Sequence, residues 1–493
     1  MPSLILRRGR LPGSDDIVDL RVVDGVITHI GHIDSAERAE TTVHLGERWI
    51  IPGLWDNHVH FTQWAQSARR LNLNSAASAA EAAVMVGERL LSESAAAGMR
   101  AGEPHTFVGT GFRDGLWPDA PSRSVLDAVA ATMPVVLVSG DLHSCWLNSA
   151  ALVRYGYADH PTGLLREDEA FDVVRALETV SDAVMDSWVD EAARSAAARG
   201  IVGVVDLEMT WNLDAWTRRM AAGTRSLRVD FGIYSQHLER AIGLGLRTGD
   251  VVAGTDGLLR VGPFKVITDG SLNTRTAYCF DDYPDGSGHG LLTVPQNELL
   301  PRMRAAAQAG LTPAVHAIGD QANRLALDAF EAIGCRGSIE HAQLLTDSDI
   351  ARFAPLGIVA SVQPEHAMDD RDVADHFWAG RTERAFPLAS LLAAGATLSL
   401  GSDAPVAPLD PWVTMAAAVG RSRNDREAWH PEQSISRQAA LAASAHGRHR
   451  IVVDDVADLA VCDIDPLSAS VADLRNMPVA ATLIAGRFTH NSL

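Results

Sequence analysis

The chain has 493 residues, of which 47% are hydrophobic and 21% are charged, a composition typical of a globular protein with more than one domain. Its formal net charge of -20 argues against nucleic acid and anionic membranes as partners. The sequence contains no apolar run of about 18 residues, and its first residues lack the apolar region of a signal peptide. The four cysteines show no C-x-x-C spacing, so we expect free thiols in a reducing cytoplasm: Cys145, Cys279, Cys335 and Cys462.

Both ends of the chain are rich in strand patterns. Residues 4–11, 18–30 and 42–51 alternate apolar and polar side chains, and Asp24-Gly25 provides a turn signal between them. Residues 457–463 and 480–490 show the same pattern. Because chain termini often lie close together, we expect residues 1–52 and 450–493 to form one small composite β-sandwich domain.

The middle of the chain, residues 53–449, alternates apolar strands with amphipathic helices such as 298–309 and 321–333. This alternation is typical of βαβ units with a parallel sheet. Eight strands predict an α/β fold of the (β/α)8 TIM barrel type. An α/β insertion at about 71–180, with its own strands at 105–111 and 134–139, follows the first barrel strand. The eight predicted barrel strands are residues 50–60, 201–207, 228–234, 263–268, 311–316, 337–341, 358–362 and 397–402.

Six polar residues fall at the ends of predicted strands, where barrels carry their catalytic groups. An H-x-H pair on a strand places both imidazoles on one face, which suits a divalent metal ion. Each part alone has an ordinary explanation, because 18 histidines make a chance H-x-H pair common and an aspartate after Gly-Ser often belongs to a turn. Their joint order along the chain favours a metal site. The six residues are His58, His60, Lys265, His316, His341 and Asp403.

Lys265 is the only lysine among the 42 basic residues of the chain. Arginine is a permanent cation, whereas a buried lysine can become a neutral, reactive amine. The isolated lysine is therefore either a chance result of an arginine-rich composition or a residue whose amine the site requires.

The ordered motifs resemble the amidohydrolase superfamily, and more narrowly its YtcJ-like group, amidohydrolase family 3. The resemblance extends over nearly the whole chain. It departs from the usual DGSLGSRTA at one place, where Asn273-Thr274 replaces Gly-Ser. The similar segments are IIPGLWDNHVHF, GDLHSCWLNSAAL, TGLLRE, KVITDGSLNTRTA, VHAIGD, IEHAQ, SVQPEH, LGSDAPV and VADLAVCDIDPL.

The resemblance implies a binuclear metal centre with zinc as the default ion. Lys265, carboxylated by carbon dioxide at its amine, would bridge two ions. His58, His60 and Asp403 would bind the more buried ion, and His316 and His341 the other. Two alternatives stay open for Lys265: an unmodified lysine beside one metal ion, and a structural ion pair with Asp269.

The implied activity is metal-dependent hydrolysis of a non-peptide, amide-like C–N bond in a small molecule, in the enzyme class EC 3.5. A hydroxide held by the metal would attack the carbonyl carbon, with Asp403 as general base and then general acid. The alternatives are hydrolytic deamination of an amidine-like ring and a non-catalytic barrel scaffold. The H-x-x-E motif usual in deaminases is absent after His316, and a scaffold would have lost ligands. A homodimer is expected only from general frequency.

Other residues are candidates for the surroundings of the reaction. Asp56 and Asn57 either orient imidazole N–H groups or are ordinary polar residues at a strand end. We expect the insertion to cover the barrel mouth and to influence substrate choice, as loops do on this fold. The predicted substrate-binding residues, each with packing or loop fixation as the alternative role, are Asp269, Arg275, His143, Trp117 and His366.

Overall fold

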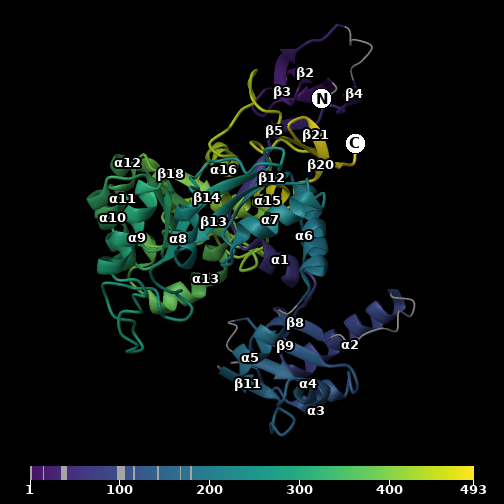
Figure 1. Ribbon diagram of the computed structural model, residues 1–493, viewed down its shortest axis with the longest axis vertical. Helices are drawn as coiled ribbons and strands as arrows, with labels where there is room; N and C mark the ends of the chain where they lie inside the picture. Colours follow the sequence, from purple (N-terminus) through teal and green to yellow (C-terminus); the bar gives the residue numbers. More distant parts are fainter. Residues whose placement is uncertain are drawn as a thin grey trace. The chain divides into compact units, whose positions relative to one another are not determined.

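The computed structural model describes residues 3–14, 16–34, 41–96, 106–114, 117–140, 144–166, 168–177 and 180–493. It divides into two compact units, residues 1–64 with 190–493 and residues 65–189 (Figure 1). The second unit corresponds to the insertion expected at about 71–180. Among the described ranges, no helix is long and apolar enough to cross a membrane.

The first unit contains an eight-stranded parallel barrel sheet in the order β18-β17-β16-β15-β14-β13-β12-β6. The eight predicted strands are therefore present, and the (β/α)8 prediction is confirmed. The strands are β6 (Leu54–Val59), β12 (Ile201–Asp206), β13 (Arg228–Tyr234), β14 (Leu259–Ile267), β15 (Pro313–Ala317), β16 (Gly337–His341), β17 (Ile358–Val362) and β18 (Thr397–Leu400).

Helices follow most of the barrel strands, as expected of βαβ units. The two helices predicted from apolar periodicity are α9 and α10, and Asp320 opens the second with Gly334 in a left-handed conformation at its end. The helices are α1 (Phe61–Ser67), α6 (Asp182–Ala197), α7 (Asn212–Ala221), α8 (Leu238–Gly243), α9 (Gln296–Gln308), α10 (Asp320–Ile333), α11 (Asp347–Ile350), α12 (Phe353–Leu356), α13 (Pro364–Phe377), α14 (Leu388–Ala393), α15 (Pro411–Gly420) and α16 (Arg437–Ala443).

Strands from both termini form a second eight-stranded sheet, drawn in purple and yellow in Figure 1. Its two halves share one hydrophobic core that includes Leu6, Leu20, Val461 and Leu483, so the predicted composite domain is present. A short helix, α17 (Val471–Arg475), lies between β19 and β20. The strands are β1 (Leu4–Arg10), β2 (Ile17–Val23), β3 (Val26–Gly31), β4 (Thr41–His44), β5 (Trp49–Pro52), β19 (Leu459–Cys462), β20 (Val479–Ile484) and β21 (Arg487–Asn491).

The predicted first barrel strand, residues 50–60, is two strands that belong to different sheets. β5 pairs with β19 in the terminal sheet, whereas β6 pairs with β12 in the barrel. Gly53 lies at the junction, where a Cβ atom would approach Val202 Cγ1 to 2.3 Å. The segment therefore divides because its two parts pair with different strands, β19 and β12.

The second unit has a five-stranded sheet in the order β11-β10-β9-β8-β7. Both strands predicted for the insertion are present as β8 and β9, although the expected start of the former at His105 lies outside the described residues. The elements are β7 (Leu71–Asn72), α2 (Ala79–Ala96), β8 (Phe107–Phe112), α3 (Arg123–Asp127), β9 (Val135–Ser139), β10 (Ser144–Leu147), α4 (Ser149–Arg154), β11 (Leu164–Arg166) and α5 (Asp168–Leu177).

The barrel and the terminal sheet are joined by a buried ion pair. Arg228 on β13 donates to both carboxylate oxygens of Asp458, at 2.7 and 3.0 Å. Asp458 also accepts a hydrogen bond from the amide of Ala485 at 2.8 Å and is only 6% exposed. Removing this carboxylate would leave the Ala485 amide without this acceptor and the Arg228 guanidinium with only the carbonyl of Gly257, at 3.1 Å.

We predict that Asp458→Ala lowers the free energy of unfolding by about 2 to 3 kcal/mol, because it breaks a buried charged pair. The midpoint of denaturant-induced unfolding measures the change. Glu298→Ala is the matched control, because Glu298 pairs with Arg302 while 48% exposed and should contribute about 0.5 kcal/mol or less. Equal midpoint shifts in the two variants would contradict this account of the junction.

Candidate metal centre

Six side chains gather at the carboxyl-terminal ends of the barrel strands. His58 is on β6, Lys265 on β14, His316 on β15 and His341 on β16. His60 directly follows β6, and Asp403 lies three residues after the end of β18. The His58 ring lies 4.9 Å from the His341 ring, and the His341 ring lies 4.4 Å from that of His316. The six residues predicted from the sequence therefore lie together at one end of the barrel.

Asp403 contacts both histidines of the H-x-H pair. Its Oδ1 atom lies 3.5 Å from His58 Nε2 and 3.3 Å from His60 Nε2. Its Oδ2 atom lies 3.8 Å from Nε2 of His366, the first-turn histidine of α13. The two carboxylate oxygens of Asp403 thus lie close to three imidazoles.

The closing edge of the barrel fixes this arrangement. The amide of Asp403 donates to the carbonyl of His58 at 2.7 Å, and the amide of His60 donates to the carbonyl of Ala404 at 2.9 Å. Gly401 permits the approach, since a Cβ atom there would lie 2.7 Å from the His58 nitrogen. The backbone that closes the barrel therefore also sets the ligand positions.

Two of these residues have unusual backbone conformations. His341 has φ 75° and Asp403 has φ 57°, and both are left-handed conformations that non-glycine residues seldom adopt. Such strain persists only where the surrounding structure enforces it, and it concentrates at functional sites. In a regular strand, the side chains of Glu340 and His341 would point to opposite faces. The left-handed conformation of His341 lets both side chains point into the barrel, where each lies near His58.

Glu340 is a site residue that the sequence analysis missed. Its Oε2 atom lies 2.7 Å from His58 Nδ1, and its Oε1 atom accepts a 2.5 Å hydrogen bond from Ser338. Only 3% of the residue is exposed. The segment IEHAQ contains it, but the prediction rests on the residue that ends the strand, which is His341.

Lys265 is 1% exposed, and its Nζ atom lies 3.5 Å from His58 Nε2. Burial lowers the pKa of its amine, against the raising effect of Glu340 and Asp403. Among the described residues, no carboxylate lies within ion-pair distance of Nζ. The alternative ion pair with Asp269 is therefore wrong, because Asp269 instead accepts hydrogen bonds from the backbone amides of Tyr278, Ile318 and Gly319.

Burial also determines the charge state of the imidazoles. It lowers the pKa of His316 to about 3, assisted by the charge of Lys265, and lowers the pKa of His341 well below its ordinary value. Burial would raise the pKa of Asp403, but its contacts with His58 and His60 hold it well below the usual value. His60 differs, because its contact with Asp403 outweighs burial and raises its pKa. The cluster thus combines an ionised carboxylate with imidazoles of lowered pKa at His316 and His341.

These donors fit a divalent metal ion. Two groups each have ligand atoms within 4.8 Å of one another, namely His58 with His60 and Asp403, and His341 with His366 and Asp403. Four buried ring nitrogens have no hydrogen-bond partner within the described part of the chain, as expected where a further ligand belongs. They are His60 Nδ1, His316 Nε2, His341 Nδ1 and His366 Nε2.

His366 was predicted to contact substrate, and the structure places it in the second of these groups. His316 is in neither group. Its Nε2 atom faces Asp269 Oδ1 at 3.5 Å. Asp269 is 1% exposed, and burial raises its pKa to about 7 despite its backbone hydrogen bonds.

The remaining predicted substrate-binding residues that the structure describes belong to neither group of candidate metal ligands. Arg275 pairs with Asp285 at 3.3 Å and lies over the ring of Phe377 at 5.3 Å. In the second unit, Trp117 packs against Phe112 and Trp146 within a hydrophobic core. His143 lies outside the described residues. Substrate contact by these residues stays a prediction.

Asp56 and Asn57 bind backbone groups, which favours the second of the two roles left open for them, polar residues at a strand end. Asp56 accepts hydrogen bonds from the amides of His58 and Ser402 at 3.1 and 3.0 Å. Asn57 donates to the carbonyls of Leu400 and Ala443 at 2.8 and 3.3 Å. Both residues strengthen the seam between β6 and β18.

Comparisons with known proteins identify the family of the chain. A family described as "Amidohydrolase family" matches residues 41–490. The protein LONG AFTER FAR-RED 3 of Arabidopsis thaliana is 31% identical over 81% of this chain and 74% of its own length. Putative amidohydrolase YtcJ of Bacillus subtilis is 25% identical over 95% of each chain. N-substituted formamide deformylase of Arthrobacter pascens is 27% identical over 74% of this chain and 75% of its own.

A solved structure shows the same fold. It is an uncharacterized metal-dependent hydrolase from Pyrococcus horikoshii, with a TM-score of 0.79 and 23% identity. The match covers 95% of this chain and 99% of the other.

We predict that His341→Asn weakens divalent metal binding by about 100-fold or more, since even residues that only contact ligands change affinity by about 10- to 100-fold. Asparagine tolerates the positive φ of this position, so loss of the imidazole is separated from backbone strain. Metal content after dialysis against buffered zinc measures the effect. His376→Asn on the exposed side of α13 is the control, and equal metal content in both variants would exclude His341 as a ligand.

Proposed function

Because the chain belongs to the amidohydrolase family, we propose that it is a metal-dependent hydrolase of a small molecule, cleaving a non-peptide, amide-like C–N bond. The observation that carries this proposal is the shared carboxylate of Asp403. It belongs to both groups of candidate metal ligands. A carboxylate in that position can both help to hold a metal ion and move a proton at the reacting atoms.

The choice of a C–N bond draws support from a relative. The Arthrobacter enzyme is named for deformylation of N-substituted formamides, which breaks the bond between a formyl carbon and a nitrogen. Its identity of 27% supports a shared type of reaction better than a shared substrate. We therefore propose the class of bond and leave the acyl group and the amine open to the experiment below.

We propose zinc as the ion, held by His58, His60, Lys265, His316, His341 and Asp403. Bound divalent ions would supply Lewis-acid activation of water and of the carbonyl group. Lys265 would enter as a carbamate, in which its neutral amine bonds to the carbon of carbon dioxide and loses a proton to solvent. The lowered pKa of the buried amine favours the neutral form that this step needs, and a guanidinium could not replace it.

Asp403 would carry the proton through the reaction. Its pKa, well below the usual value, makes it an ionised acceptor before substrate reacts. Water would add its oxygen to the carbonyl carbon while one of its protons passes to Asp403. The C–N bond would then break as Asp403 delivers that proton to the nitrogen, because an amine leaves poorly until it is protonated.

We predict that Asp403→Asn lowers kcat by about 10²- to 10⁴-fold, the usual contribution of a positioned acid or base. Asparagine keeps an oxygen at the same place, so a substantial part of the metal content should persist. Steady-state kinetics together with metal analysis of the same preparation measure both quantities. A variant with near-normal turnover would remove Asp403 from the proton transfer.

The single lysine makes the carbamate easy to test. In wild-type protein equilibrated with ¹³C-labelled bicarbonate, we predict a carbamate carbon resonance that Lys265→Arg lacks, together with loss of metal from that variant. Lys265→Arg keeps the N-terminal amine, so it supplies the background signal of that group. Identical spectra from the two proteins would exclude a carbamate at Lys265.

A substrate screen separates the competing activities. We predict turnover among N-formyl amines, N-acyl amines and cyclic amides when the zinc-loaded protein is assayed by the release of amine or by ring opening. Ammonia released only from amidine-like rings would favour a deaminase instead. Metal binding without turnover of any compound in either series would favour a barrel that has lost its activity.

A further inference from the structure

We propose that Glu340 is the positioning residue of the metal centre, holding the His58 imidazole in the one tautomer and orientation that leave Nε2 free to bind a divalent ion. This inference deepens the proposed function and rests on its metal dependence. It concerns a residue that contacts a ligand and not the reacting atoms.

The contact that carries the inference is short and buried. Glu340 Oε2 lies 2.7 Å from His58 Nδ1, while the two residues are 3% and 1% exposed. A competing contact, from Gln363 Nε2 to the same ring nitrogen, is much longer at 3.4 Å. The opposite ring nitrogen, Nε2, faces Asp403 Oδ1 at 3.5 Å. Nδ1 of the His58 ring therefore faces the glutamate, and Nε2 faces the other candidate metal ligands.

The charges of the pair decide where the ring proton lies. One oxygen of Glu340 accepts from the hydroxyl of Ser338 and the other faces His58 Nδ1, so both carboxylate oxygens are placed as acceptors. An ionised carboxylate can only accept, so the proton between the two groups belongs to His58 Nδ1. With that proton on Nδ1, the opposite nitrogen Nε2 keeps the lone pair that a metal ion needs.

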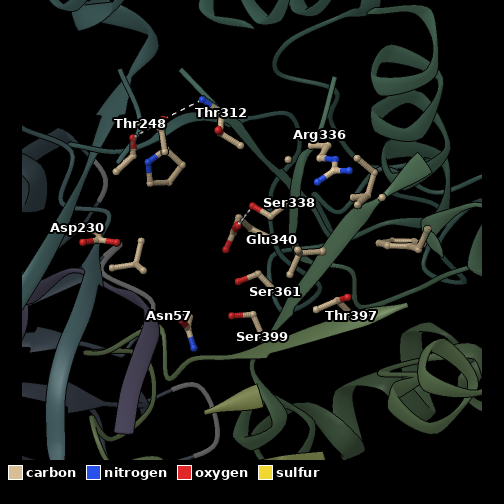
Figure 2. A pocket seen from close by; sticks show the side chains of 18 of the residues that line it. Asn57, Asp230, Thr248, Thr312, Arg336, Ser338, Glu340, Ser361, Thr397 and Ser399 are labelled. Atoms are coloured by element: carbon tan, nitrogen blue, oxygen red, sulfur yellow. Dashed lines mark hydrogen bonds between the residues drawn. The ribbon is translucent and has the colours of Figure 1, made fainter. Parts of the chain in front are cut away.

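Glu340 is itself fixed by a hydrogen bond to its other carboxylate oxygen. The hydroxyl of Ser338 donates to its Oε1 atom at 2.5 Å, so both carboxylate oxygens have a partner. Figure 2 shows these two side chains together on the wall of a cavity of about 720 Å³. A carboxylate with both oxygens engaged cannot rotate freely, and this restricts the imidazole in turn.

The cavity explains why a carboxylate can occupy the barrel interior. It opens among the first residues of the strands, at the end opposite the metal ligands, and Ser361, Thr397 and Ser399 line it beside Glu340 (Figure 2). Barrel interiors are usually filled by branched apolar side chains. Here hydroxyl groups surround the carboxylate instead, and the hydroxyl of Ser361 is buried without a partner among the described residues. Polar space of this size suits ordered water.

The test is metal affinity, measured without substrate. We expect Glu340→Gln to weaken zinc binding by about 10- to 100-fold, because loss of a residue behind a ligating histidine has that effect. Glutamine keeps an oxygen that can accept from Nδ1, so Glu340→Ala should weaken binding further. Competition against a fluorescent zinc indicator measures both. Ser399→Ala alters the same cavity wall at a residue that makes no hydrogen bond to Glu340 in the described structure, so it is the control and should bind as wild type does.

A purely structural role makes a different prediction. It would lower the thermal midpoint of the metal-free variants while leaving the zinc affinity of the folded fraction unchanged. The near-isosteric Glu340→Gln variant keeps the test usable if Glu340→Ala fails to fold. Wild-type zinc affinity in folded Glu340→Gln and Glu340→Ala would overturn the inference.

Failure of the inference and failure of the proposed function give different results. If wild type binds zinc, the variants bind it weakly and no amide is hydrolysed, the role of Glu340 stands while the activity is wrong. If amides are hydrolysed and the variants bind zinc as wild type does, the activity stands while the role of Glu340 is wrong. A wild-type protein that binds no divalent ion would overturn both.

Discussion

The site depends on the seam at which the barrel closes. Two backbone hydrogen bonds, from Asp403 to His58 and from His60 to Ala404, join the first strand to the segment after the last one. They bring together ligands that are about 340 residues apart in the sequence. Asp56 reinforces the same seam by binding the amide of Ser402. Without closure of this edge, the aspartate and the H-x-H pair would belong to separate strands with no common site.

Burial then gives the gathered side chains their chemistry. Removing His316 and His341 from water lowers their pKa and favours neutral nitrogen donors, and the same effect lowers the pKa of the lysine amine. At His60 the contact with Asp403 raises the pKa instead. The carboxylates respond differently, because nearby histidines and Lys265 outweigh the desolvation of Asp403 and Glu340. The end of the barrel thus holds imidazole nitrogens beside carboxylate oxygens, and divalent ions bind to this combination of ligands.

Much of this arrangement could be predicted from sequence because it depends on regular patterns. Eight apolar strands at barrel spacing, and polar residues at the ends of those strands, identify the fold and six gathered side chains. The role of Glu340 could not be predicted in this way, because the positive φ of His341 breaks strand alternation and no local sequence rule reveals that conformation. The division of residues 50–60 between two sheets could not be predicted either, because pairing with strands that are distant in the sequence sets that boundary. The two possible roles of Asp56 and Asn57 could not be separated from sequence, since their backbone partners follow only from closure of the barrel.

The location of a bound metal ion tests the central claim most directly. Anomalous scattering from crystals of the zinc-loaded protein, collected on both sides of the zinc edge, would place each ion without reference to any substrate. The account predicts a peak within bonding distance of His58, His60 and Asp403, with Glu340 still bonded to His58 Nδ1 on the other side of the ring. A zinc peak bound elsewhere on the chain, with these three side chains uncoordinated, would contradict it.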